Sequence, residues 1–175
     1  SLGLSELEGG AHPKLTLAVA TEPVTEDQLA HLCLAERKPF YTADLPYLWG
    51  RACENNSIIF GAGLVQAPHS DDLNDVDISA AEVRQIFDSL EKRVRGLHPA
   101  LKSVRFTHRW GGPILFRDSW KPIFMWHPEA RKQKNAIVIA AFAGHGVALS
   151  SYLGRWAAEA LQAHRKLPSW GKLEA

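Results

Sequence analysis

The sequence predicts an α/β or α+β fold, in which a mostly antiparallel sheet with flanking helices is followed by a terminal strand and helix of a second domain. Short β-rich runs joined by turn-forming residues predominate before residue 135. Residues 79–96 carry apolar side chains at helical spacing. A continuous apolar run over residues 136–143 then leads through a glycine-rich turn into a further amphipathic segment.

Length and composition fit one globular domain with its own core. The chain has 175 residues, of which 46% are hydrophobic and 22% are charged, and its formal net charge is +1. So small a net charge argues against nucleic acid or an anionic membrane as partner. The longest apolar stretch, residues 136–143, is far shorter than the roughly 20 residues of a membrane-spanning helix. Cys33 and Cys53 lack metal-ligand spacing and no secretory leader is present, so we expect a reduced, cytoplasmic protein without a metal site.

The first elements are one strand and one short helix. Residues 15–20 are rich in Leu, Val and Ala and end before Pro23, which cannot donate to a sheet. Thr25 and Gln28 form a capping-box pattern, and the apolar residues that follow supply one helical face. The chain starts at Ser1 in a loose segment, which we expect to be a cut or processed end.

The next predicted element is a hairpin. Residues 47–53 and 57–64 are β-rich and are joined by Glu-Asn-Asn at residues 54–56, a segment that tolerates turn conformations. The polar, acidic residues 71–77 predict a loop.

Residues 79–96 predict a helix. Ser79 and Glu82 form a capping pattern at its start, and Gly96 with Pro99 is expected to end it. The apolar positions of this helix are Val83, Ile86, Phe87, Leu90 and Val94.

Three further strands are expected before the terminal pair of elements. Residues 102–110 alternate between apolar and polar side chains, which predicts a strand with one buried face formed by Val104, Phe106, His108 and Trp110. Residues 114–116 and 123–126 predict shorter strands. The basic segment 131–135 reads as a hairpin turn and a solvated loop rather than a phosphate-binding site.

The junction after the apolar run has the clearest chemical meaning. Residues 136–143 predict a strand covered on both faces, and Gly144-His145-Gly146 connects it directly to a helix over residues 147–163. Two glycines permit a sharp turn and a close ligand approach, and the first amides of a helix favour an electron-rich atom. The alternative is that the glycines only permit a tight turn.

Three segments resemble one known family. Residues 140–147, Ala-Ala-Phe-Ala-Gly-His-Gly-Val, are followed by Gly-Arg at 154–155 and Ala-Glu at 158–159. This pattern resembles the final strand and helix of the D-amino-acid oxidase and glycine oxidase superfamily, especially its putrescine-oxidase-like members. His-Arg-Trp-Gly-Gly-Pro at 108–113 resembles the strand ending in Trp-x-Gly beside the flavin ring. Pro-Tyr-Leu-Trp-Gly-Arg at 46–51, with Ile-Ile-Phe-Gly-Ala-Gly at 58–63, resembles the hairpin of the substrate domain.

The resemblance implies FAD as cofactor and oxidation of a C–N bond of an amine or amino acid, by hydride transfer to flavin N5. It places the cofactor beside Gly111, Gly112, Gly144, His145, Gly146 and Val147, and the substrate beside Tyr47, Trp49, Arg51 and Trp110. It implies a substrate-binding domain over residues 1–134, and the terminal strand and helix of the FAD-binding domain over 135–175. Members of the family commonly need little acid–base assistance, so no catalytic residue is assigned.

One family motif is missing. The sequence contains no Gly-x-Gly-x-x-Gly, which would hold the pyrophosphate of FAD. Residues 61–66 come nearest, but Gln66 replaces the third glycine and Pro68 prevents a helix, so we interpret them as the end of the hairpin. We therefore expect the C-terminal portion of the enzyme, binding FAD weakly or not at all by itself. Two alternatives also explain the missing motif. The chain could be a stand-alone ligand-binding module, or a subunit completed by a partner chain that carries the nucleotide-binding half.

A second departure concerns the substrate. Amino-acid oxidases of the family hold the substrate carboxylate with arginines at positions that correspond to Ile114 and Val147 here. The sequence therefore favours an amine, or an amino acid held by another residue, for which Arg51 is the candidate. Arg51 could equally be a surface or structural arginine, and the other tryptophans could simply fill the core.

Overall fold

The computed structural model describes residues 11–66, 77, 79–128 and 132–172. The chain divides into two compact units, Lys14–Pro113 and Ser1–Pro13 with Ile114–Ala175. The division therefore follows residue 113, whereas the sequence placed the boundary after residue 134. The assignment of substrate-binding and FAD-binding domains stays a prediction. In the part of the chain that the structure describes, no helix is long and apolar enough to cross a membrane.

The unit Lys14–Pro113 is built on a five-stranded sheet with the strand order β2-β3-β4-β1-β5. Its strands are β1 His12–Thr21, β2 Phe40–Tyr41, β3 Leu48–Ala52, β4 Ile58–Gln66 and β5 Phe106–Phe116. The predicted hairpin is confirmed, because β3 pairs with β4 in antiparallel register with Gly50 opposite Phe60. β1 pairs antiparallel with β4 and the short β2 with β3. The mostly antiparallel fold class is therefore confirmed.

The short helix α1, Glu26–His31, begins as predicted. The Oγ1 atom of Thr25 accepts a hydrogen bond from the amide of Gln28 at 3.1 Å. The Gln28 side chain accepts one from the amide of Thr25 at 2.9 Å. These reciprocal bonds satisfy two amides that the helix itself cannot satisfy.

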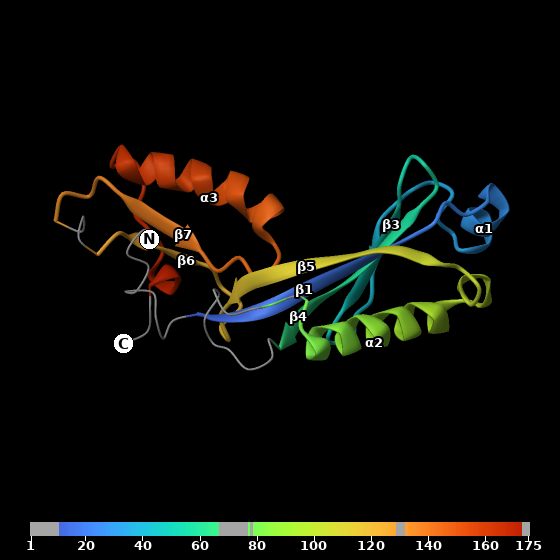
Figure 1. Ribbon diagram of the computed structural model, residues 1–175. Helices are drawn as coiled ribbons and strands as arrows, with labels where there is room; N and C mark the ends of the chain where they lie inside the picture. The colour runs from blue at the N-terminus through green and yellow to red at the C-terminus, as the bar shows by residue number, and fades with distance from the viewer. Residues whose placement is uncertain (1–10, 67–76, 78, 129–131, 173–175) are drawn as a thin grey trace. The chain divides into compact units, whose positions relative to one another are not determined.

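The helix α2, Ala81–Leu97, runs along one face of the sheet (Figure 1). Its apolar side packs into a core with the inward residues of β1, β3 and β4, which include Leu15, Leu17, Val19, Leu48, Ile58 and Phe60. The predicted start and end are each wrong by one or two residues. Ser79 does not cap the helix, because its hydroxyl donates to Asp77 at 2.7 Å and Ala80 occupies the N-cap position. Gly96 lies inside the last turn, and the helix ends at Leu97, before the extended His98 that precedes Pro99. Of the predicted loop 71–77, only Asp77 lies within the described residues.

β5 differs from its prediction in length and in burial. It is one strand over Phe106–Phe116, where the sequence indicated two shorter strands. Val104 is buried but precedes the strand, and His108 and Trp110 are exposed. The predicted buried face is therefore wrong for these two residues. The side chain between them, Arg109, contacts α2, so the face towards the helix is occupied by a charged residue instead.

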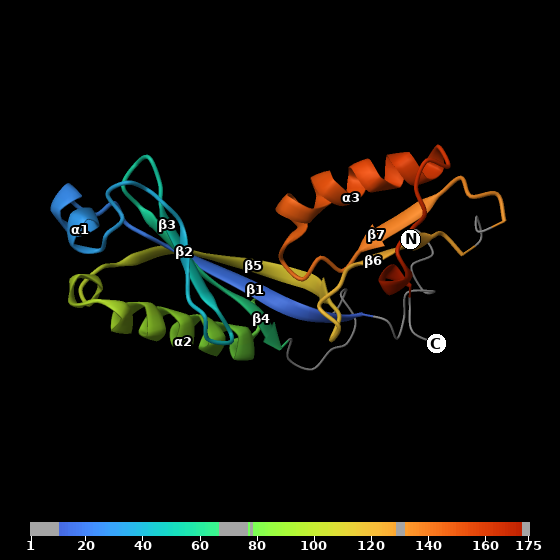
Figure 2. The ribbon, with the colours of Figure 1, turned by 180° about the vertical axis from the view of Figure 1, so that it is seen from behind.

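The other unit contains the hairpin β6 Ile123–Trp126 and β7 Ile137–Ala140, followed by α3 Gly146–Leu161 and the short η4 Ser169–Gly171. β6 and β7 pair antiparallel, with Phe124 opposite Ile139. α3 lies beside this hairpin (Figure 2) and packs on it through Leu153 and Ala157. The expectation of a strand covered on both faces is wrong, because all of β7 is only half-buried. Residues 132–134 form the turn region that was expected, while residue 131 lies outside the described residues.

Candidate functional site

The predicted site residues fall into two groups. Gly144, His145, Gly146 and Val147 belong to the unit with α3, and the remaining ones belong to the unit with the five-stranded sheet. Each group is described by itself.

The junction between β7 and α3 is an abrupt turn with an unusual backbone. Ala141, Ala143 and Gly144 have φ values of 57°, 51° and 87°, in the left-handed region that non-glycine residues rarely adopt. The amide of His145 donates to the carbonyl of Phe142 at 2.9 Å, which closes the turn. Left-handed alanines cost about 1 kcal/mol each, and such strain is concentrated at functional positions. The junction therefore has a backbone that local propensity alone would not select.

The start of α3 exposes groups that suit a ligand. Its first intrahelical bond joins the amide of Leu149 to the carbonyl of His145 at 3.0 Å, so the amides of residues 146–148 have no acceptor within the helix. His145 makes no side-chain capping bond, and Val147 is 94% exposed. An apolar side chain thus lies uncovered beside unsatisfied amides at the positive end of a helix. That combination fits an apolar ring with an electron-rich edge.

The two glycines of the junction have different reasons to be glycine. Gly144 adopts a φ of 87°, which an L side chain would make strained. Gly146 has an ordinary backbone, and an added Cβ would lie 3.6 Å from Phe142, at ordinary contact distance. The fold itself therefore tolerates a small side chain at residue 146. This leaves the approach of an external group as a reason for a glycine there.

Four members of the second group lie on the sheet face opposite α2, which we call the open face. Along β3, Leu48, Gly50 and Ala52 are buried towards the core. Alternation along a strand directs the neighbouring residues to the opposite face. Tyr47, Trp49 and Arg51 therefore share the open face. Tyr47 and Trp49 are half-buried there, and Arg51 is exposed.

Two glycines of β4 make room for these aromatic rings. A Cβ on Gly61 would lie 2.1 Å from the Trp49 ring, and one on Gly63 would lie 2.5 Å from the Tyr47 hydroxyl oxygen. The rings therefore lie directly against the β4 backbone, and both glycines are buried. Burial raises the pKa of the Tyr47 hydroxyl above its usual value. The interpretation of residues 61–66 as the end of the hairpin is confirmed, since they are the last residues of β4, although the strand continues to Gln66.

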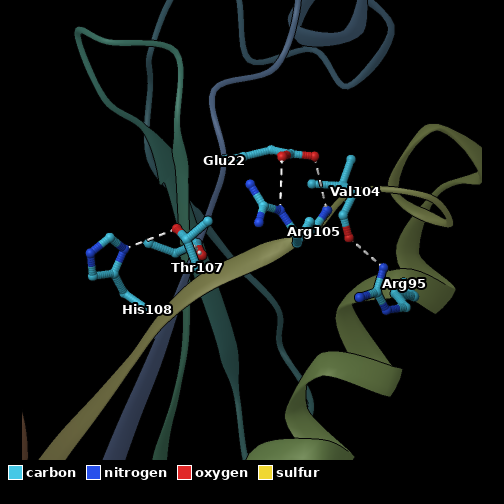
Figure 3. A network of polar contacts seen from close by, with 7 residues as sticks. Glu22, Arg95, Val104, Arg105, Thr107 and His108 are labelled. Carbon is cyan, nitrogen blue, oxygen red and sulfur yellow. Dashed lines mark hydrogen bonds and ion pairs between the residues drawn. The ribbon is translucent and has the colours of Figure 1, made fainter.

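β5 contributes Trp110 to the same open face. Arg109 is bound to α2, with Nη2 at 2.7 Å from Asp88 and Nε at 2.8 Å from Glu91. His108 points to the other side of β5, away from Arg95 of α2 (Figure 3). Trp110 is two residues further along the strand and shares the face of His108. Its side chain is 41% exposed.

The structure thus brings the four predicted substrate residues, Tyr47, Trp49, Arg51 and Trp110, onto one face of one sheet. Their role as substrate contacts stays a prediction. Sequence reasoning missed His108 as a member of this face, because it was assigned to the core. It also missed the part that Gly61 and Gly63 play, since the alternation of aromatic residues and glycines on paired strands appears only once the register is known.

Gly111 and Gly112 have different surroundings. A Cβ on Gly111 would lie 2.5 Å from the carbonyl oxygen of Thr16 and 2.6 Å from Leu17, so packing between β5 and β1 requires a glycine there. Gly112 has nothing within 4 Å of an added Cβ. Packing thus accounts for Gly111 without a ligand, and the flavin contact predicted for both glycines stays a prediction.

Other chemical groups are dispersed. Within the described ranges, no three His, Cys, Asp or Glu residues gather as metal ligands would. Cys33 is an exposed free thiol, and Cys53 is half-buried on the hairpin. The ring of Trp156 packs against Phe124 at 5.6 Å and Trp170 at 6.3 Å, as a core aromatic does.

One unit thus carries an antiparallel sheet with an aromatic open face, and the other a strand that enters a helix through a Gly-His-Gly turn. The chain belongs to the FAD dependent oxidoreductase family, which it matches over residues 4–160.

Known relatives agree with this assignment. The chain is 27% identical over 159 residues to gamma-glutamylputrescine oxidoreductase of Escherichia coli (strain K12), an alignment that covers 90% of this chain and 33% of that protein. The fold is similar to L-proline dehydrogenase from P. horikoshii, with a TM-score of 0.68 at 20% identity over 93% of this chain and 39% of that one. It is also similar to glycine oxidase from Bacillus cereus, with a TM-score of 0.67 at 16% identity over 97% and 42%. The chain therefore spans about a third of the length of the curated relative that it matches.

Proposed function

We propose that the complete protein oxidises a C–N bond of an amine or amino acid, with FAD as electron acceptor. In this proposal the present chain supplies the substrate face and contacts to the flavin ring. The family match supports the reaction class, and so do the names of two relatives, gamma-glutamylputrescine oxidoreductase and glycine oxidase.

The geometry of the junction is the observation that carries the proposal. Gly144, His145, Gly146 and Val147 combine free helix-initial amides, a glycine that packing does not require and an exposed apolar side chain. FAD supplies a hydride acceptor, a chemistry that amino-acid side chains lack. The chain's own part is to hold the electron-rich edge of the ring with backbone amides. Fixed dipoles of this kind stabilise charge that develops during a reaction.

The nucleotide half of FAD is held by protein outside these 175 residues, either by another part of the same polypeptide or by a partner chain. The lack of a Gly-x-Gly-x-x-Gly in the sequence supports this, and so does the position of residues 61–66 within an antiparallel β4. The finer assignments of residues 1–134 and 135–175 to two domains, and of a cytoplasmic location, belong to the same proposal.

The substrate proposed is an amine rather than a simple α-amino acid. Ile114 and Val147 occupy the positions where the resemblance implies carboxylate-binding arginines, and neither side chain can donate a hydrogen bond. A buried carboxylate without a charge-assisted partner loses a few kcal/mol, which is roughly a hundredfold in specificity.

This preference is measured by dye reduction with the complete protein, using paired amines and α-amino acids of matched side chain. We predict faster turnover of each amine than of its α-amino-acid partner, by roughly a hundredfold in kcat/KM. Dye reduction serves oxidases and dehydrogenases alike. Glycine or alanine turning over far better than every amine would contradict the substrate proposal, and turnover of neither class would contradict the reaction class.

A further inference from the structure

Arg51 differs from the other arginines of its unit in having no partner. In the described part of Lys14–Pro113, each of the others donates a hydrogen bond or forms an ion pair; these are Arg37, Arg84, Arg93, Arg95, Arg105 and Arg109. Arg51 has no such contact with any described residue. Among the described arginines of this unit, it is therefore the one available to bind an external anion.

The cross-strand neighbours of Arg51 on β4 and β1 carry no charge. Across the sheet Arg51 pairs with Ile59, and Ile59 pairs in turn with Ala20, so this row of the sheet is apolar on the β4 side of β3. Along β3, Trp49 lies two residues away on the same face, about 7 Å distant by the rise of a strand. An unpaired guanidinium beside aromatic and aliphatic groups favours an anion that brings its own apolar body.

We propose that Arg51 determines specificity by binding a carboxylate of the substrate on the open face. The inference rests on the proposed function and deepens it, because it specifies an amine that carries a carboxylate away from the oxidised C–N bond. The face of Trp49 accepts the cationic or apolar body of that molecule. This placement agrees with Ile114 and Val147, which leave no carboxylate partner at the α position.

The first experiment uses the chain by itself and needs no flavin. The chain is titrated with phenylacetate and, separately, with the uncharged 2-phenylethanol, while the indole N–H signal of Trp49 is followed by NMR. The Trp49→Phe variant assigns the signal. We expect phenylacetate to shift the signal at concentrations at least about tenfold lower than 2-phenylethanol, because only the carboxylate pairs with Arg51. Added salt should weaken the difference.

Arg51→Gln should remove that preference, and Arg51→Lys should retain part of it. Arg84→Gln is the matched control, since Arg84 belongs to α2 and is bound to the carbonyl of Ser79. It should bind like the unaltered chain. Equal binding of the two probes, or a preference that survives Arg51→Gln, would overturn the inference.

The second experiment uses the complete protein and compares an amine that carries a carboxylate with its carboxamide. Arg51→Gln should lower kcat/KM for the carboxylate roughly ten- to a hundredfold, mainly through KM, and leave the amide within about twofold. Equal losses on both substrates would show a structural role and refute the inference. If the chain prefers phenylacetate through Arg51 but the complete protein oxidises no amine, the proposed function fails and the carboxylate site stands.

Discussion

At the scale of single residues, glycines in similar sequence patterns have distinct physical roles. Gly144 is needed for its left-handed backbone, and Gly61 and Gly63 are needed because aromatic rings lie against them. Gly146 is required by neither cause. The spacing predicted a tight turn correctly, but a Gly-x-Gly pattern contains no information on φ or on the residue across a strand pair. The strained alanines at 141 and 143 were therefore also beyond prediction.

Gly144 and Gly154, a glycine inside α3, should respond in opposite ways to substitution by alanine. Gly144→Ala should lower the free energy of unfolding by about 1 kcal/mol, because its φ of 87° disfavours a Cβ. Gly154→Ala should raise it by about 0.5–1 kcal/mol, since Gly154 lies inside α3 with nothing within 4 Å. Urea unfolding of both variants measures the effects. Destabilisation by Gly154→Ala as large as that by Gly144→Ala would contradict the backbone geometry of the junction.

At the scale of elements, α2 holds β5 from behind the open face. Arg109 forms ion pairs with Asp88 and Glu91, and its guanidinium lies 5.8 Å from the ring centre of Phe87. Its neighbours His108 and Trp110 are thereby directed away from the helix. Periodicity predicted α2 and its buried positions well, because an amphipathic helix has a strong repeat. Periodicity assigned the two faces of β5 wrongly. The residue that faces the helix is the ion-paired Arg109, and the apolar Trp110 lies on the exposed face, which is the reverse of the usual pattern.

Removing this contact should loosen the packing of β5 on α2. Arg109→Ala should cost about 1–2 kcal/mol of unfolding free energy, from half-exposed ion pairs of about 0.3–1 kcal/mol each and a cation–π contact of similar size. A double-mutant cycle with Glu91→Ala isolates the pair, and its coupling energy should fall in high salt. Asp44 forms a separate ion pair with Arg93. The loss of unfolding free energy in Asp44→Ala should therefore be additive with that in Arg109→Ala. A coupling energy of zero between Arg109 and Glu91 at low salt would count against the contact.

At the scale of the whole molecule, the chain matches only part of the length of its relatives. The family pattern covers residues 4–160, yet this length corresponds to 33% of the curated relative and to 39–42% of two similar structures. The family and fold class were predictable, because motifs such as residues 140–147 are local and the hairpin pattern is regular. The division after residue 113 was not, because the boundary expected after residue 134 separates β6 from its partner β7.

Flavin binding by the purified 175-residue chain tests most directly the claim that these residues contact the ring and not the nucleotide. FAD and lumiflavin, which is the ring without the nucleotide, are titrated under the same conditions. We predict no stoichiometric FAD after purification and similar, weak dissociation constants for the two ligands. Each absent charge-assisted pyrophosphate contact forfeits about 1.5–3 kcal/mol, or roughly tenfold or more in affinity. Gly146→Val should abolish the binding of both FAD and lumiflavin while the fold stays intact. Gly154→Ala should change the binding of neither ligand. A yellow chain with one tightly held FAD, or undiminished binding after Gly146→Val, would contradict the account.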